Sequence, residues 1–226
     1  MKQNEQKKEN ERSFSIITKI RLHSRVMQIK TRMKILMKEK INDKYANLLQ
    51  ATLTLVNNRG FHDTPMSKIA KLAGVSPATI YLYFENKQDL INKLYLEVKA
   101  SFCSYAFQGY TIELTVKKGF EVIWYNIADY KLNKIDEAMF LSQCDNTPMI
   151  DEVSIQKGLK HLQPLLDLWE RGKKEGIIKS ISPYLLYAYT VYPLSFLLAM
   201  HVKGIMTIGE KDRQEAFHAA WDSIKV

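Results

Sequence analysis

The stretch TPMSKIAKLAGVSPATIYLYFENKQD, residues 64–89, predicts two short helices joined by a tight turn and followed by the start of a third helix. Thr64 is placed to cap the first helix, and Pro65 suits its first position, where a missing N–H costs nothing. Gly74 supplies the left-handed residue that ends this helix.

The second half of the stretch repeats these signals. Ser76-Pro77 opens the second helix, on which Ile80 and Phe84 share a buried side, and Asn86 with Asp89 opens the third. Two short helices around a glycine turn are typical of the helix-turn-helix, whose second helix lies in the DNA major groove. A helical hairpin with solvated polar faces is the alternative that periodicity leaves open.

The residues themselves favour the DNA-binding interpretation. Over roughly residues 43–96 the chain closely resembles the N-terminal DNA-binding domain of TetR-family transcriptional regulators. The matching landmarks are Leu48-Leu49-Gln50-Ala51 through Val56, Gly60-Phe61, Ile69-Ala70, Ala73-Gly74-Val75-Ser76, Ile80-Tyr81-Leu82-Tyr83-Phe84 and Asn86-Lys87. For the rest of the chain the resemblance implies only an architecture, an all-helical ligand-binding and dimerisation domain.

Hydroxyl and lysine side chains gather on and around the second helix, and these are the usual contacts of DNA phosphates. Ala78 and Leu82 are placed to meet base edges or thymine methyl groups. Leu82 replaces the more polar residues common there in the family, which puts hydrogen-bonded base readout at that position in doubt. The predicted DNA-binding residues are Thr64, Ser67, Lys68, Ser76, Pro77, Ala78, Thr79, Tyr81, Leu82, Tyr83 and Lys87.

The positive charge of the chain lies mostly in its first 41 residues. The whole chain carries a formal charge of +9, and residues 1–41 hold 12 of the 33 Lys and Arg against 4 of the 24 Asp and Glu. The high charge is therefore no independent support for DNA binding. This basic extension is open to three interpretations: an arm that contacts DNA, a segment on an anionic membrane surface, or, with Met33 and Met37 near the first helix, a mis-assigned start.

The pattern predicts an all-α fold in three parts: residues 1–41 as a partly disordered or mis-assigned extension, 42–90 as the helix-turn-helix domain, and 91–226 as the ligand-binding and dimerisation domain. The first helix is expected over 43–58, and one starting near Lys87 continues towards Ala106 and joins both domains. Later helices are expected over 112–132, 134–145, 152–175 (kinked or divided at Pro164), 183–203 and 210–224, with further start signals at Thr147-Pro148 and Ser182-Pro183.

The segment from Tyr184 to Val202 is almost entirely apolar and long enough to be a transmembrane span. Pro193 in its middle, and tyrosines well inside it, argue against a membrane position. A helix that is apolar all round can equally be buried in a soluble protein. The TetR resemblance implies that the last two helices form a four-helix interface with a second subunit, and we favour that interpretation.

The sequence shows no catalytic motif, no metal-ligand set and no cofactor fingerprint. Cys103 and Cys144 stand alone and are expected to be buried thiols in a reducing cytosol. The second domain is rich in aromatics, which core packing or a ligand cavity would equally explain. The predicted ligand-binding residues are Trp124, Tyr125, Phe140, Trp169, Tyr187 and Tyr192; if Glu121 or Glu137 faced the same cavity, the ligand would be cationic.

We therefore expect a cytoplasmic, homodimeric, non-enzymatic regulator that binds a double-stranded DNA operator and responds to a small-molecule effector as a repressor. No cofactor, metal or membrane is expected among its partners. Two other classes remain open from the sequence: a membrane-associated protein, and a helical small-molecule-binding protein or enzyme that does not bind DNA.

Overall fold

The structure, a computed structural model, describes residues 42–226, so the predictions for residues 1–41 lie outside the described residues. The chain divides into two compact units, Met1–Asn47 and Leu48–Val226. Residues 42–47 are helical, and the second unit begins with the helical residues 48–59. Ten further helices follow: α2 (Met66–Leu72), α3 (Pro77–Ile80), α4 (Lys87–Ala106), α5 (Val116–Asn133), α6 (Ile135–Asn146), α7 (Glu152–Lys160), α8 (Gln163–Lys174), α9 (Pro183–Thr190), α10 (Pro193–Val202) and α11 (Glu210–Ile224).

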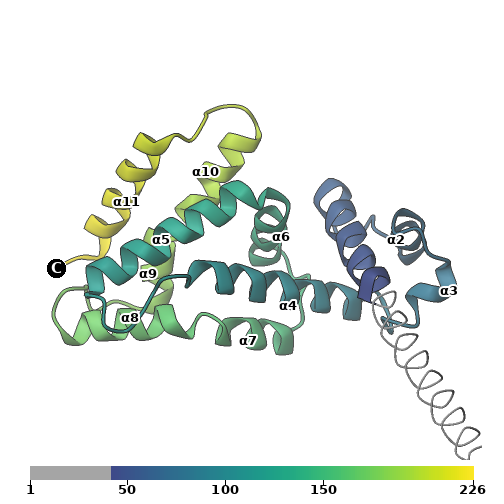
Figure 1. The fold of residues 1–226 in the computed structure, drawn as a ribbon, viewed down its shortest axis with the longest axis horizontal. Coiled ribbons are helices and arrows are strands. Elements are labelled where there is room, and N and C mark those ends of the chain that lie inside the picture. Colours follow the sequence, from purple (N-terminus) through teal and green to yellow (C-terminus); the bar gives the residue numbers. More distant parts are fainter. Residues whose placement is uncertain (1–41) are drawn as a thin grey trace, which may run out of the picture. The chain divides into compact units, whose positions relative to one another are not determined.

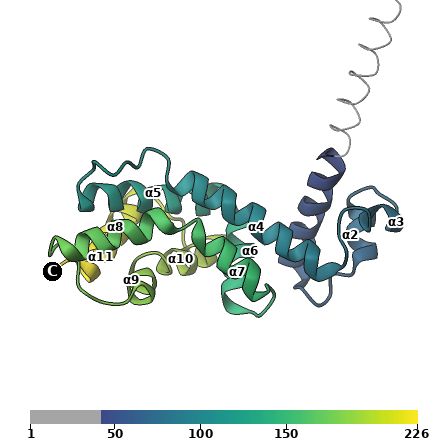
Figure 2. The ribbon, with the colours of Figure 1, turned by 90° about the horizontal axis from the view of Figure 1, so that it is seen from below.

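The all-α prediction is confirmed, since the described residues contain no strand beyond an isolated bridge between Ile178 and Lys225. Helix α4 runs from the small helices α2 and α3 into the larger helical body, where α5, α6 and α7 pack against it (Figure 1). Figure 2, turned by 90°, shows α8 beside α5 and the α9–α10 pair near α11.

Three predicted helix starts are confirmed by their capping bonds. The Ser76 side chain accepts a hydrogen bond from the Thr79 backbone N–H, Asn86 does the same for Asp89, and Ser182 for Leu185. In each case the side-chain oxygen satisfies a backbone donor that has no partner inside the helix.

Two predicted starts are wrong. Helix α2 begins at Met66 with Pro65 as its N-cap residue, and the Thr64 hydroxyl instead donates back to the Gly60 carbonyl at 2.8 Å. Thr147-Pro148 opens no helix, because the Asp151 side chain caps α7 three residues later. A capping side chain needs extended backbone directly before the first turn, and tertiary packing decides which residue has it.

Prolines divide two of the predicted helices. The helix predicted over 152–175 is two helices, α7 and α8, with Pro164 in the first turn of α8. The helix predicted over 183–203 is likewise divided into α9 and α10, with Pro193 at the start of α10. Proline is tolerated in the first turn of a helix, where the backbone N–H has no partner inside the helix. Further along it would leave an intrahelical hydrogen bond unmade. Helix α5 begins at Val116, later than the predicted residue 112, because Thr115 caps it.

One continuous core joins the first helix of the second unit to the larger body. Leu53 and Val56 belong to the same buried cluster as Ile91 and Leu94 of α4. Further along, this cluster contains Trp124 and most other large apolar side chains of α5, α8 and α11. The start of α4 is therefore fixed by packing on both sides.

A lysine lies inside this apolar body. Lys131 of α5 is only 7% exposed, and its pKa is lowered to about 8. Burial is the largest cause, Asp145 opposes it, and Lys99 adds to it. Its ammonium donates a hydrogen bond to the Ser195 hydroxyl of α10 at 2.9 Å. A buried ammonium with one neutral partner costs stability, since it loses its hydration shell.

We predict that Lys131→Met stabilises the fold at pH 7 by about 1–3 kcal/mol, as a pKa lowered by roughly two and a half units implies. The folded protein releases this proton near pH 8 and the unfolded chain near pH 10.5, so the advantage of the variant shrinks as the pH rises between them. Urea unfolding of both proteins from pH 7 to 10 measures the difference. The raised pKa values of Cys103 and Cys144 affect both proteins and cancel. A difference in unfolding free energy between the two proteins that stays constant with pH would contradict the burial of a charged Lys131.

Candidate functional site

The turn between α2 and α3 has the geometry that the sequence predicts. Gly74 adopts a φ of +69°, a conformation that side chains disfavour, and the Val75 N–H bonds back to the Ala70 carbonyl at 3.0 Å. Ile69 and Ile80 are both fully buried, so the two helices pack through these faces and leave their polar faces outward. This is the arrangement of a helix-turn-helix.

The second helix of this motif is shorter than predicted. Helix α3 ends at Ile80, and residues 81–83 continue as turns, with the Leu82 N–H bonded to the Thr79 carbonyl at 3.1 Å. Tyr81 is 58% exposed and Leu82 is 82% exposed, so both side chains are available to a partner. Ser67, Lys68, Ser76, Pro77 and Ala78 are also exposed, while Thr79 and Tyr83 are half-buried.

Two of the predicted DNA-binding residues, Thr64 and Lys87, have side chains that contact other parts of the domain and are not fully exposed. Thr64 is fully buried, with its hydroxyl bonded to Gly60. The half-buried Lys87 ammonium donates to the His62 carbonyl at 3.2 Å and lies 4.3 Å from the centre of the Phe61 ring. Partial burial lowers the pKa of Lys87, with Asp63 opposing the change. Lys87 therefore fastens the start of α4 to the segment before α2.

The structure brings one further basic residue to this surface. Arg59 and Lys68 line a shallow hollow together with His62, Asp63 and Pro65. Sequence reasoning missed Arg59 because it lies at the end of the first helix, outside the turn motif. Its position directly before Gly60, which ends that helix with a φ of +77°, could have indicated that Arg59 lies close to the motif.

The predicted ligand-binding aromatics do not gather around one cavity. Phe140 and Trp169 are buried in the core, Tyr125 and Tyr187 are half-buried, and Tyr192 is 44% exposed. Trp124 is buried, with its indole N–H bonded to the Thr190 carbonyl at 2.9 Å.

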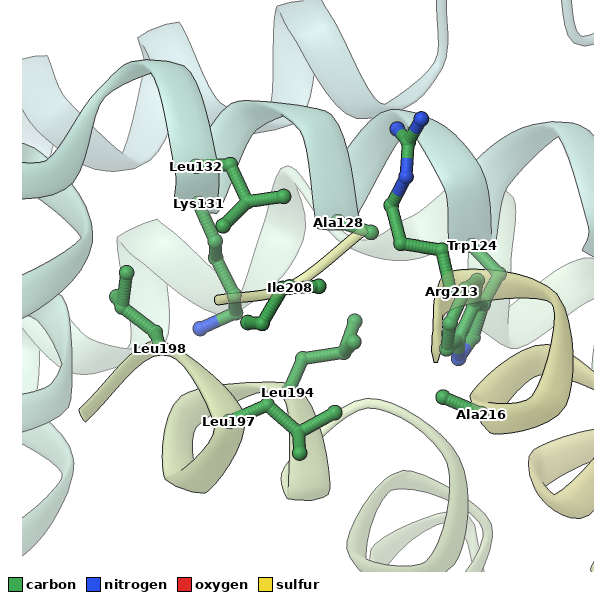
Figure 3. Close-up of a pocket in the computed structure, with 10 residues that line it drawn as sticks. All are labelled: Trp124, Ala128, Lys131, Leu132, Leu194, Leu197, Leu198, Ile208, Arg213 and Ala216. Atoms are coloured by element: carbon green, nitrogen blue, oxygen red, sulfur yellow. The ribbon is translucent and has the colours of Figure 1, made fainter. Parts of the chain in front are cut away.

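Trp124 does line an enclosed cavity between α5, α10 and α11, together with Lys131, Leu194, Leu198 and Ala216 (Figure 3). Its volume is about 20 Å³, which is room for about one water molecule. This cavity is too small for an effector as it stands. Two larger grooves lie at the surface, of about 270 Å³ between α9, α10 and α11 and about 360 Å³ between α6 and α10.

The charge near these spaces is opposite to the sequence-based expectation. Glu121 pairs with Lys118, and Glu137 accepts a hydrogen bond from Tyr130, so neither carboxylate lines a described cavity. In Figure 3 the Lys131 ammonium reaches towards Leu198 at one end of the cavity, and the Arg213 guanidinium points away from it. The expectation of a carboxylate that selects a cationic ligand finds no support in this geometry.

Helices α9 and α10 carry a large exposed apolar surface. Tyr184 is 84% exposed, Tyr189 53% and Phe196 63%. Among the described residues, Pro183–Val202 is one segment whose length and composition would suit a membrane span. In this structure the segment is instead two shorter helices that pack against α5, α6 and α11.

Two family models match the chain. The model described as "Bacterial regulatory proteins, tetR family" matches residues 48–94, and the "Tetracyclin repressor-like, C-terminal domain" matches residues 115–225. Together they span both the helix-turn-helix and the helices from α5 to α11.

Similar proteins are named as regulators and not as enzymes. The fatty acid metabolism regulator protein of Bacillus subtilis is 42% identical over 66 residues, which are 29% of this chain and only 34% of that relative. A TetR-family transcription regulator from Marinobacter aquaeolei superposes with a TM-score of 0.78 at 24% identity, covering 83% of this chain and 98% of its own. The transcriptional regulator FadR from Bacillus subtilis, solved in complex with stearoyl-CoA, gives 0.61 at 20% identity, covering 79% and 96%. These two structures support the fold alone. With the family models matching both halves, the chain belongs to the TetR family and is a DNA-binding transcriptional regulator.

Proposed function

We propose that this regulator binds a pseudo-palindromic operator as a cytoplasmic homodimer and acts as a repressor released by a small-molecule ligand. The observation that carries the DNA-binding half is the exposed surface at and after α3, where Tyr81 and Leu82 stand out from a buried anchor at Ile80. Because Ile80 holds the short helix to the rest of the domain, the exposed side chains beside it can enter a major groove.

The proposed contacts divide by chemistry. Hydroxyls of Ser67, Ser76, Thr79, Tyr81 and Tyr83 and the ammonium of Lys68 would bind phosphates, which fixes register without reading sequence. Pro77, Ala78 and Leu82 would lie against base edges. Lys87 would act near the backbone while holding α4 in place, and Arg59 joins the phosphate-binding set. Thr64 is left out because its side chain is buried.

The dimer proposal rests on the exposed apolar surface of α9 and α10. Contiguous exposed apolar surface of this kind marks an interaction site in a soluble protein. A second copy packed there about a two-fold axis would cover Tyr184, Tyr189 and Phe196, and α11 would complete a four-helix interface. Two recognition elements would then face half-sites about 34–36 Å apart, or a multiple of that distance.

Ligand response would work through the relative positions of those two elements. A ligand that binds better to a dimer whose elements no longer match the operator spacing shifts the population to that state. Its differential affinity sets the size of the shift. The B. subtilis FadR structure, which was solved in complex with stearoyl-CoA, supports the proposal that this chain binds a small-molecule ligand.

We predict that Tyr81→Ala weakens binding to promoter DNA and to random DNA alike, by about tenfold, because it removes a phosphate hydrogen bond. Leu82→Ala should instead reduce the preference for the promoter over random DNA, since a lost apolar base contact changes discrimination. Fluorescence anisotropy with both DNA fragments measures the two effects. Ile112→Ala, at an exposed apolar residue before α5, is the control. If Leu82→Ala weakened binding to both DNA fragments equally, as is expected of Tyr81→Ala, this division of roles would be refuted.

We predict that Phe196→Glu converts the dimer to monomers, because it buries a charge in an apolar interface. Light scattering after size exclusion measures the mass. Val153→Glu on α7 is matched, since Val153 and Phe196 are both 63% exposed, and it should leave the dimer intact. If the Phe196 variant stays dimeric, the interface is elsewhere.

A further inference from the structure

The groove between α6 and α10 is a candidate binding site. Its volume is about 360 Å³, at the lower end of the range for small-molecule sites. Met139, Ser142 and Gln143 line it from α6, Ser195 and Val202 line it from α10, and Lys203 follows at its edge.

Positive charge dominates around this groove. None of the described residues that line it is acidic, and Lys203 is exposed at its edge. Behind its wall, the ammonium of Lys131 donates to the Ser195 hydroxyl at 2.9 Å. The charges that act on Lys131 are Lys99 on α4 and the exposed acid Asp145 on α6. Arg213 on α11 lines the same small cavity as Lys131.

These charges do not cancel. Arg213 is paired with Asp129 and Glu210, whereas the ion pairs of the described residues include neither Lys99 nor Lys131. Asp145 is thus one acid against two lysines that are each 7% exposed. A buried excess of positive charge is relieved by an anionic partner, and the Ser142 and Ser195 hydroxyls add hydrogen-bonding groups at the same wall.

The rest of the groove wall is aliphatic. The apolar surface comes from Met139, Leu198, Ala199 and Val202, and within the described part of the chain no aromatic side chain lines it. A flexible aliphatic chain fits such a wall better than a flat ring system, which would gain from stacking partners that are missing here. The site is therefore suited to a ligand that has an anionic head and an aliphatic body.

One wall of the groove is bonded to the DNA-binding domain. The Gln143 side-chain amide donates to the Asn57 side-chain oxygen at 3.1 Å, and the Asn57 amide donates to the Asp136 carbonyl at 2.8 Å. Asn57 lies on the helix that directly precedes α2 and α3 in the chain. A ligand that moves Gln143 changes a direct bond to that helix.

We propose that the groove between α6 and α10 binds an amphiphile with an anionic head and an aliphatic body, and that Gln143 transmits its binding to the DNA-binding domain through Asn57. The ligand chemistry stands on the groove alone, while the transmission step rests on the proposed function as a ligand-responsive DNA-binding protein.

The binding step is tested by calorimetry on the full chain at pH 7, with decanoate, decyl phosphate and decyltrimethylammonium as probes of matched chain length. We expect at least one anionic probe to bind tenfold or more tightly than the cationic one. The tighter of the two anions then identifies the head group as a carboxylate or a phosphate. Equal binding of anions and cation, or no binding of either anion, overturns the proposal.

Lys131→Met tests whether the buried ammonium selects the anion. We expect it to reduce binding of the preferred anion at least tenfold while its thermal melt shows an intact fold. Lys157→Met, at an exposed lysine of α7, is the control and should bind as the wild type does. Lys203→Gln gives a second variant at the groove edge, with an expected loss of a few fold. Unchanged anion binding in both groove variants refutes the charge argument.

The transmission step is tested by DNA-binding anisotropy with and without the preferred anion at saturation. We expect the anion to change the affinity of the wild type for its promoter fivefold or more. Asn57→Leu, which removes the same bond to Gln143 from outside the groove, should still bind the anion but lose this response. Gln163→Met on α8, which removes a surface amide elsewhere, should keep it.

The outcomes separate the two proposals. A chain that never binds its promoter contradicts the proposed function, and calorimetry still decides the ligand chemistry of the groove. A wild type that binds both DNA and anion without coupling, or an Asn57 variant that responds normally, overturns the transmission step alone.

Discussion

The structure depends on the packing of one continuous helix, α4, against both halves of the described fold. Leu90 at its start is fully buried, and Ile91 and Leu94 join Leu53 and Val56 in the main core. Farther along, Val98 and Phe102 pack in that same cluster with α5. Because close-packed side chains do not deform continuously, a displacement at one end of such a helix is carried as a rigid movement to the other.

Side-chain hydrogen bonds add two further links between these halves. Asn57 is held to α6 through Gln143 and the Asp136 carbonyl. Near the start of α4, Gln88 donates to the Met149 carbonyl at 2.7 Å, and Asn92 bonds to Asp151. Hydrogen bonds of this kind contribute little net stability, but they are directional and can be exchanged for others. They therefore give the two halves direct contacts that a small displacement can make or break.

Buried charge lowers the stability of the helical domain. Lys131 and Lys99 lie inside an otherwise apolar body, where hydrophobic side chains of similar volume would be more stable. Such a cost is typical of binding sites, where an interaction is held ready for a partner that completes it. The enclosed cavity beside Lys131 holds no more than about one water, so the larger groove across Ser195 is the better place for that partner.

The helix-turn-helix and most helix ends follow from local signals in the sequence. Gly74, Ser76-Pro77, Asn86 and Ser182-Pro183 act through bonds to residues two to four positions away, so their effect can be read without the fold. The N-cap position of Thr64 was wrong because its hydroxyl finds a partner in Gly60 before α2 begins.

The buried charge and the long-range hydrogen bonds of the helical domain depend on tertiary packing. Lys131 sits in a run that also carries Lys134, and nothing local tells which of the two is buried. The bond between Gln143 and Asn57 joins residues 86 positions apart. Burial and long-range pairing depend on which helix faces pack together, and that is set by the sum of many apolar contacts and not by any local motif.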